Sequence, residues 1–446
     1  MAALYDEKTA REPPNGRIMM ANMNRRQFGG AAAAGAASLA AGPAFAQGSS
    51  ISFISYTYAE EPNKPVFQKV MDDFKAASGV TVEPIASAWG ETQKNIMLRQ
   101  RSRTLMDSAQ LQDRWVPSMA TLPEIVDIGG LIPESDLEAA LAPSVLSLGR
   151  VGEKRIGVPF VSGSVGFVAN TDVLKKAGVD KIPVTMDEFR SALVAVRDKV
   201  PNSVPFAMAT KNPSSIPLDV LLLVWIFNGR IIDDSGKVVI NSPEGRAAMS
   251  FMASAMKDKL IAPELDRPDS RRLFAQGSAA FYIDAPQARG FIRSFSGLGE
   301  KADAFTLPMK SPVLKQGDPP RSVEWGHVVA LFKSQKPIDK GGPQDKWVRY
   351  LISDATQTTF PLQIGGLPVT KSARAAPAVQ NDPFLKAWAE ATGVTMKHEI
   401  GVWSNAPELS TILSEETQAA LLGQKTPDAA VAAIQTRMEA SMAKRG

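Results

Sequence analysis

Short apolar runs alternate with amphipathic stretches along the first hundred residues after position 50. Residues 51–56 read as a strand, and Val66, Val70 and Phe74 then recur at four-residue spacing before Gly79, which predicts an amphipathic helix. Residues 80–85 alternate between apolar and polar positions and predict a second strand. This strand–helix–strand opening predicts a parallel sheet whose ligand-facing loops lie at the carboxyl ends of its strands.

Three successive strand ends in this region carry an aromatic residue, or an aromatic residue with polar neighbours. They present Tyr56 after the first strand, Trp89 after the second, and Gln112 and Asp113 after a third strand at 107–111. A single aromatic residue belongs to a core more often than to a site, but three at matching topological positions favour a shared binding site.

The stretch 155–178 looks like a crossing between two lobes. An apolar run at 158–161 is interrupted by Ser162, Gly163 and Ser164 and resumes at 165–169, so two strands are expected to meet at a flexible seam. Residues 170–178 then have the caps and composition of a short helix ended by Gly178. The alternative is one βα unit within a single domain, its strand softened by glycine.

The remaining pattern predicts further helices and strands beyond the crossing. Thr185 with Glu188 three residues later predicts a capping box, and the apolar run 217–227 predicts a buried helix. Further strands are expected at 237–241, 277–284 and 328–332, and a proline-led helix after 242. Helices are expected at 384–392 and at 407–443, the latter with a break near 425–427.

Length and composition set limits on this reading. The chain has 446 residues, which is longer than single cores usually grow, so two lobes are expected. Cysteine is absent, and His327 and His398 are the only histidines. Disulfides, thiolate metal sites and a cysteine nucleophile are therefore excluded, and no metal or other cofactor is expected.

The segment 24–46 has the pattern of a twin-arginine export signal. Arg25 and Arg26 precede a weakly apolar alanine and glycine run that ends in a small-x-small motif at 44–46, which predicts cleavage between Ala46 and Gln47. Removal of 1–46, with five basic and three acidic side chains, lowers the net charge from +4 to +2. The scattered basic residues are not a nucleic-acid footprint, and without cysteine there is no lipid anchor. We expect a periplasmic protein that is free of the membrane.

The sequence contains no complete motif for covalent catalysis or phosphoryl transfer. Ser164 lacks the spacing of a nucleophile elbow, because Ser162 stands where the first glycine should be. No phosphate-binding loop is present, and the glycines at 297 and 299 follow a helix-like stretch rather than a strand. No acidic residue stands at a sequence spacing that would pair it with His327, so a structural role is favoured. His327 is nevertheless kept among the candidate ligand-binding residues.

Aromatic and neutral polar side chains at loop tips remain. Flat aromatic faces cover the C–H patches of a sugar ring, while amides, carboxylates and hydroxyls bond its hydroxyl groups, so this combination suits a carbohydrate. The candidate ligand-binding residues are Tyr56, Trp89, Gln112, Asp113, Ser162, Ser164, Asp284, Trp325, His327, Trp403 and Asn405.

The order of these segments resembles a bacterial extracellular solute-binding protein of family 1, the periplasmic sugar-binding component of ABC importers. The stretches that carry the resemblance are MDSAQLQDRWVPSM (106–119), RIGVPFVSGSVGFVANTDVLKKAG (155–178), TMDEFRSAL (185–193), GKVVINSPEGRAAMSFM (236–252), LFAQGSAAFYIDAP (273–286), EWGHVVALFK (324–333) and IGGLPVTKSA (364–373). No single stretch is specific, but seven in the family's order behind an export signal are.

The resemblance implies an α/β chain with the two-lobed type II binding-protein fold. The expected division is the extension and signal at 1–46, lobe 1 at 47–162 and 320–367, and lobe 2 at 163–319 and 368–446. The resemblance also implies that the protein is a monomer without enzymatic activity. It would bind a sugar, oligosaccharide or polyol and deliver this solute to an ABC permease.

Two points stay open at this stage. Relatives often carry an acidic residue where Gln112 is followed by Asp113, so either of these could meet the ligand. Two other functions also remain: an exported glycoside hydrolase that uses two carboxylates, or a binder of a charged solute such as an organic phosphate, a sulfonate or a polyamine. Arg114, Arg289 and Arg374 keep an anionic solute in consideration.

Overall fold

A computed structural model describes residues 49–334, 337–392 and 394–444; the predicted export signal at 24–46 lies outside this part. Its sheet begins as predicted. Strand β1 (Ser50–Ser55) pairs in parallel with β2 (Thr81–Ala86) and with β3 (Ser108–Gln112). Helix α2 (Lys64–Ser78) connects β1 to β2 and buries the predicted apolar face, including Phe67, Val70 and Phe74. The strand–helix–strand opening is therefore confirmed.

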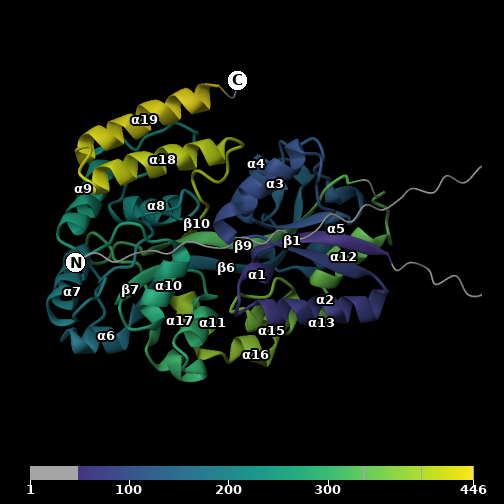
Figure 1. Ribbon diagram of the computed structural model, residues 1–446, viewed down its shortest axis with the longest axis horizontal. Coiled ribbons are helices and arrows are strands. Elements are labelled where there is room, and N and C mark those ends of the chain that lie inside the picture. Colours follow the sequence, from purple (N-terminus) through teal and green to yellow (C-terminus); the bar gives the residue numbers. More distant parts are fainter. Residues whose placement is uncertain (1–48, 335–336, 393, 445–446) are drawn as a thin grey trace, which may run out of the picture. The chain divides into compact units, whose positions relative to one another are not determined.

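Two long strands carry the chain from one part of the sheet to the other. Strand β9 (Arg321–Leu331) runs antiparallel to β3 and to the first part of β6 (Gly157–Asn170). The last residues of β6 pair instead with β7 (Phe281–Asp284) and β8 (Thr306–Met309), and β10 (Val394–Met396) pairs with the start of β9. The resulting order is β2-β1-β3-β9-β6-β7, and Figure 1 shows β6 and β9 at the centre.

The crossing at 155–178 differs from the prediction in one respect. Residues 157–170 form one strand of 14 residues rather than two strands that meet at a seam. Ser162, Gly163 and Ser164 stay extended because β9 lies opposite them in register, from Gly326 to Glu324. Backbone pairing across the sheet thus outweighs the weak strand propensity of the small residues.

A helical group covers the part of the molecule that contains β7 and β8. The apolar helix α8 (Ile216–Ile226) is buried along its whole length, as predicted. It packs with α9 (Pro243–Lys257) and α18 (Ala406–Leu421), and both of these pack with α19 (Pro427–Ala443); the four helices lie together in Figure 1. The break between α18 and α19 falls at the expected place, where Thr426 caps the second helix.

Local capping signals are confirmed, whereas one predicted strand is wrong. Helix α7 (Met186–Lys199) starts with the capping box of Thr185 and Glu188. Residues 237–241 form no strand and share only a single bridge between Ile232 and Val238. Backbone hydrogen bonds join this stretch to residues 231–233, and the side chain of Gln435 bonds the Val238 carbonyl and the Asn241 N–H.

The other elements complete the two parts. They include α1 (Tyr56–Ala59), η1 (Trp89–Glu91), α3 (Thr92–Arg101), η2 (Asp113–Trp115), α4 (Val116–Met119), α5 (Glu134–Ala140), α6 (Thr171–Lys176), α10 (Arg267–Ala275), α11 (Ala288–Phe295), α12 (Pro343–Leu351), α15 (Lys371–Ala375) and α17 (Pro383–Ala391). Within the described ranges, every helix is too short or too polar to cross a lipid bilayer.

Candidate functional site

Three adjoining cavities share the side chain of Arg114. The inner pocket has a free volume of about 30 Å³ and is lined by Trp89, Gln112, Arg114, Val165, Leu218, Arg267, Arg271, Asp284, Ala285, Gln287, Val323, Glu324 and Trp325. The acidic cavity, about 220 Å³, is lined by Asp113, Arg114, Pro117, residues 147–152, Glu324, Lys397, His398, Gly401 and Val402. The basic cavity, about 530 Å³, is lined by Gly90, Glu91, Gln93, Lys94, Met97, Arg101, Arg114, Trp115, residues 212–214, His398, Gly401, Ala406, Pro407, Ser410 and Thr411.

The inner pocket brings together four of the predicted site residues. Trp89 follows β2, Gln112 ends β3, Asp284 ends β7 and Trp325 lies within β9. The first two come from the β1–β3 part of the sheet and Asp284 from the β7–β8 part, so strand ends far apart in sequence meet at one pocket.

Arg114 is the central side chain of the three cavities. Its Nε donates to Gln112 Oε1 at 2.8 Å, and its Nη2 donates to the Ser214 carbonyl at 3.0 Å. Its guanidinium carbon lies 5.4 Å from the centre of the Trp89 ring, in a cation–π arrangement. Within the described residues no carboxylate lies within 4.0 Å of it, so its bonds go to neutral oxygens. Burial lowers the pKa of Arg114 to about 10, which leaves it charged at neutral pH.

The other two arginines of the inner pocket are neutralised by carboxylates. Arg271 donates to both oxygens of Asp284, at 2.7 Å and 3.1 Å, and lies 3.5 Å from Glu60. Arg267 forms a buried ion pair with Asp219. Asp284, predicted as a ligand contact, therefore already bonds a protein cation with both oxygens.

The name of the acidic cavity refers to its two carboxylates, Asp113 and Glu324; the side chains of Arg114, Arg150 and Lys397 also line it. Asp113 Oδ1 accepts a hydrogen bond from the Gly326 N–H at 3.2 Å. Burial, and then the nearby charge of Glu324, raises the pKa of Asp113 to about 7. Burial also raises the pKa of Glu324. Gln112 thus faces the inner pocket while Asp113 faces the acidic cavity, so the two candidates occupy different positions in the cleft.

Tyr56 and His327 lie beneath these cavities rather than among the lining residues. The Tyr56 ring packs edge-on against His327 at 5.0 Å and against Trp115 at 5.7 Å between ring centres. His327 Nδ1 lies 2.9 Å from Gln110 Nε2, and burial lowers the pKa of His327 to about 3. His327 is therefore neutral at physiological pH and packs against Tyr56 and Gln110 rather than lining a cavity.

Ser162 and Ser164 are buried within β6, and both bond other parts of the protein. Ser162 Oγ accepts a hydrogen bond from Arg374 Nη2 at 2.8 Å. The Ser164 carbonyl accepts one from Trp388 Nε1 at 3.2 Å. The structure places neither serine among the residues that line the three cavities.

Trp403 and Asn405 also lie apart from the cavity walls, which corrects the expectation that they join the other candidates. The Trp403 ring packs over Gly236, where an added Cβ would lie 2.8 Å from Cη2. Asn405 Nδ2 donates to Ser441 Oγ on α19 at 2.8 Å. Both side chains therefore pack towards the helical group, a preference that their position in a loop did not reveal.

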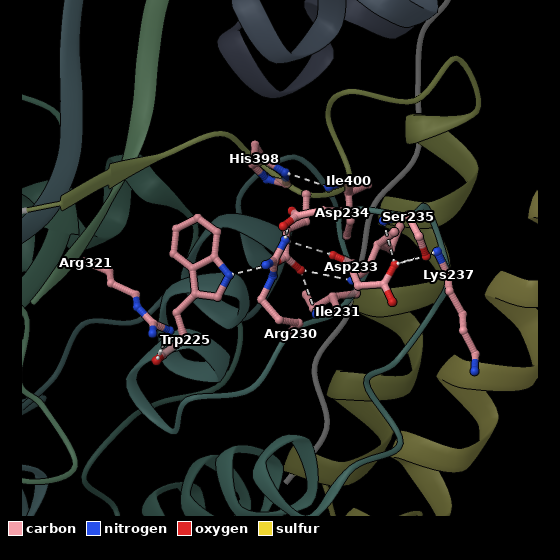
Figure 2. A network of polar contacts seen from close by, with 12 residues as sticks. Trp225, Arg230, Ile231, Asp233, Asp234, Ser235, Lys237, Arg321, His398 and Ile400 are labelled. Carbon is pink, nitrogen blue, oxygen red and sulfur yellow. Dashed lines mark hydrogen bonds and ion pairs between the residues drawn. The ribbon is translucent and has the colours of Figure 1, made fainter. Parts of the chain in front are cut away.

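Glu399, a buried carboxylate that the sequence analysis did not include in the site, holds the loop at residues 397–402 in place. Glu399 accepts hydrogen bonds from Trp225 Nε1 at 2.6 Å and from the N–H groups of Ile231 and Ile232 at 2.6 Å and 3.0 Å, and it pairs with Arg230. Figure 2 shows this network around Trp225 and Arg230, beside His398 and Ile400. Glu399 thereby fixes residues 397–402 against α8, and residues of this loop line the acidic cavity and the basic cavity.

His398 is the second residue that the sequence analysis missed. Its Nδ1 accepts from the N–H groups of Ile400 and Gly401, at 3.2 Å and 3.1 Å, as Figure 2 shows for Ile400. Burial, with the nearby charge of Arg114, lowers the pKa of His398 well below its usual value. The neutral ring therefore carries its proton on Nε2, and this donor has no partner within the described residues.

No cluster of three or more potential metal ligands occurs in the part of the chain that the structure describes.

Comparisons with known proteins give a consistent result. Residues 69–387 match the family model described as bacterial extracellular solute-binding protein. A probable ABC transporter-binding protein of Deinococcus radiodurans is 25% identical over 171 residues, which covers 37% of this chain and 40% of that relative. The match therefore spans less than half the length of this curated relative.

Solved structures share the fold at low sequence identity. The GacH receptor of Streptomyces glaucescens, described with acarbose, superposes with a TM-score of 0.75 at 18% identity, over 87% of this chain and 97% of that one. Maltose-bound MalE3 of T. maritima gives 0.75 at 22%, over 87% and 99%. A solute-binding protein of Agrobacterium radiobacter K84 in complex with ribitol gives 0.72 at 20%, over 87% and 98%. These likenesses confirm the expected two-lobed α/β fold.

Proposed function

This chain belongs to the bacterial extracellular solute-binding proteins, and we propose that it captures a sugar, oligosaccharide or polyol between its two lobes for delivery to an ABC permease. The observation that supports this most directly is the inner pocket. There Trp89 and Trp325 offer aromatic surface beside the polar groups of Gln112 and Gln287, in the combination that binds sugar rings. The similar proteins described with acarbose, maltose and ribitol agree with this substrate class.

Capture is proposed to occur by opening and closing of the lobes. The inner pocket of about 30 Å³ has room for no more than a few water molecules, so a sugar can reach it only when its walls separate. The lobes are proposed to be 47–162 with 320–367, and 163–319 with 368–446. The strands β6 and β9, which connect the two parts of the sheet, then serve as the connections about which the lobes move.

Export is part of the same proposal. The twin-arginine signal at 24–46 would direct the folded protein to the periplasm, with cleavage between Ala46 and Gln47. Mass spectrometry of the periplasmic protein tests this, because a mature chain that starts elsewhere contradicts the cleavage site.

A thermal-shift screen against sugars and polyols tests the binding function. A solute at about a hundred times its dissociation constant is expected to stabilise the protein by roughly 2.7 kcal/mol. Trp89→Ala is expected to lower the affinity for the solute about tenfold, because the stacking of the tryptophan ring on the sugar is lost. Leu98→Ala serves as the matched control, since Leu98 is 49% exposed and lines none of the three cavities. Absence of any shift across the screen would refute the proposed function.

The protein is proposed to bind its solute without turnover. Asp284, one of the two carboxylates that line the inner pocket, is already paired with Arg271. Prolonged incubation of the binding solute with the protein should return the solute unchanged by chromatography. A product that disappears in an Asp113→Asn variant would instead support a glycoside hydrolase.

A further inference from the structure

The basic cavity carries a positive charge that its own walls do not neutralise. Its charged lining residues are Lys94, Arg101, Arg114 and the single carboxylate of Glu91, which pairs with Lys94 at 3.3 Å. Arg101 is exposed on α3 and Arg114 is half-buried at the mouth of the inner pocket. Two cations therefore remain without a carboxylate of this cavity to balance them.

Arg114 is positioned to receive an anion from this side. Its Nε and Nη2 bond Gln112 and the Ser214 carbonyl, which are neutral acceptors, whereas Nη1 makes no hydrogen bond within the described residues. A guanidinium binds carboxylates and phosphates more strongly than neutral oxygens, because the attraction between opposite charges adds to the hydrogen bonds. Asp113, the adjacent carboxylate, bonds Gly326 and lines the acidic cavity rather than the basic one.

His398 supplies a second, independent donor at the same place. The side chain is only 5% exposed, lines both the acidic and the basic cavity together with Arg114, and has a buried Nε2–H without a partner within the described residues. A buried donor without an acceptor costs roughly 1–3 kcal/mol, so an acceptor atom brought by a solute would recover that free energy. The neutral ring is also a donor that adds no charge of its own.

We propose that the captured solute carries an oxyanion, a carboxylate or a phosphate, which binds in the basic cavity between the Arg114 guanidinium and the His398 imidazole. The sugar part of the same solute then faces Trp115, which lines this cavity, and Trp89, whose ring centre lies 6.2 Å from that of Trp115. This inference rests on the proposed function and narrows it from sugars in general to sugar acids or sugar phosphates.

Calorimetry with matched pairs of solutes tests the inference. The probes are D-glucose with D-glucuronate, D-galactose with D-galacturonate, D-glucose with D-glucose 6-phosphate, and inorganic phosphate alone. We expect an anionic member to bind about 10- to 100-fold more tightly than its neutral counterpart, as for a hydrogen bond to a charged group. Comparison of the uronates with the sugar phosphate shows whether the basic cavity prefers a carboxylate or a phosphate.

Variants then assign the preference to the cavity. Arg114→Gln should remove the discrimination between the paired solutes, whereas Arg99→Gln should retain it, because Arg99 lies on α3 and lines none of the three cavities. Ser410→Glu and Ser410→Gln add side chains of the same shape to the basic cavity and differ only in charge. The glutamate variant should lose about tenfold more affinity for the anion than the glutamine variant, even if Arg114→Gln does not fold.

The outcomes separate this inference from the function on which it rests. Neutral sugars that bind as tightly as their anionic counterparts would overturn the inference and leave sugar capture standing. Inorganic phosphate that binds as tightly as the sugar phosphate would show a site for the free ion and overturn the inference as well. A panel in which no solute binds would overturn the proposed function, and the inference with it.

Discussion

Replacement of Glu399 by glutamine should destabilise the protein and misplace one wall of the cleft. The carboxylate accepts four hydrogen bonds, from Trp225 Nε1, from Arg230, and from the N–H groups of Ile231 and Ile232, while its side chain is 3% exposed. Glutamine keeps the shape of the side chain but offers only one acceptor oxygen. Its amide NH₂ would face donors, so at least one buried donor loses its partner.

The magnitude follows from the groups that lose their partners. A buried donor left unsatisfied costs roughly 1–3 kcal/mol, and more where a charged partner is involved. One orphaned donor together with the loss of the charge beside Arg230 gives a destabilisation of about 2–4 kcal/mol. Arg230 limits the loss, because its Nη2 also bonds Asp234 at 2.9 Å. Solute affinity should fall as well, since Glu399 fixes the loop that contains His398.

Urea unfolding, followed by tryptophan fluorescence, measures the change in unfolding free energy. Glu408→Gln is the matched control: Glu408 is 52% exposed on α18, and its one ion pair within the described residues, with Lys444, spans 3.9 Å. Exposed pairs of this kind contribute about 0–1 kcal/mol, so the control should lie close to the wild type. If Glu399→Gln and Glu408→Gln unfold at the same urea concentration, the role assigned to this network is wrong.

Three further predictions concern the cleft and its supports. Gly401→Ala should weaken solute binding about tenfold or more by calorimetry, because the new Cβ would lie 2.5 Å from Arg114 Cβ and 3.1 Å from its Cα; Gly130→Ala, with open space around it, should not. Asp113→Asn should stabilise the protein more at pH 8 than at pH 5, by about 1–2 kcal/mol in urea unfolding, because a pKa raised to about 7 in the folded state lowers stability as pH rises from about 4 to 7; an equal effect at both pH values would contradict this. His327, whose pKa is lowered to about 3 by burial, should make the protein lose stability as pH falls below about 6.5, and His327→Gln should reduce that loss; identical acid transitions in the two proteins would count against it.

Much of the fold could be predicted because its signals are local. The capping box at Thr185, the apolar helix α8 and the break before Thr426 each depend on residues within one or two turns of each other. The parallel opening of the sheet follows from the spacing of apolar residues in α2 and the alternation in β2. In these stretches the secondary-structure propensity, the hydrophobic pattern and the capping residues all favour the structure that the tertiary contacts also favour.

The errors arise where a distant part of the chain decides the local structure. Residues 237–241 have the pattern of a strand, but Gln435 from α19 bonds their backbone. The small residues at 162–164 stay in one strand because β9 pairs with them. Trp403 has an aromatic ring in a loop, as Trp89 does, but its ring packs over Gly236 and lines none of the three cavities.

The candidate site was predictable in outline but not in its charge. Strand ends in a parallel sheet meet at one edge, so the placement of Trp89 and Gln112 follows from topology. Arg114 was considered only as one of three arginines. The structure separates them: Arg289 pairs with Asp303 and Asp382, whereas Arg114 and Arg374 bond neutral oxygens. Of these two, Arg114 lines the three cavities. Which arginine keeps an unneutralised charge depends on contacts between residues far apart in sequence, and no spacing rule encodes these.

The contacts that bridge the cleft bear on how a solute would bind. Ser214 Oγ donates to the Gly90 carbonyl at 2.9 Å, Arg114 donates to the Ser214 carbonyl, and Arg271 lies 3.5 Å from Glu60. Each such contact contributes about 0.5–1.5 kcal/mol net, so separation of the walls costs a few kcal/mol. A solute has to offset that cost through contacts made to both walls at once, because only differential affinity shifts the equilibrium towards closure. Arg114 is placed to do this, since it reaches from the end of β3 to the Ser214 carbonyl on the opposite wall, and its Nη1 makes no hydrogen bond within the described residues.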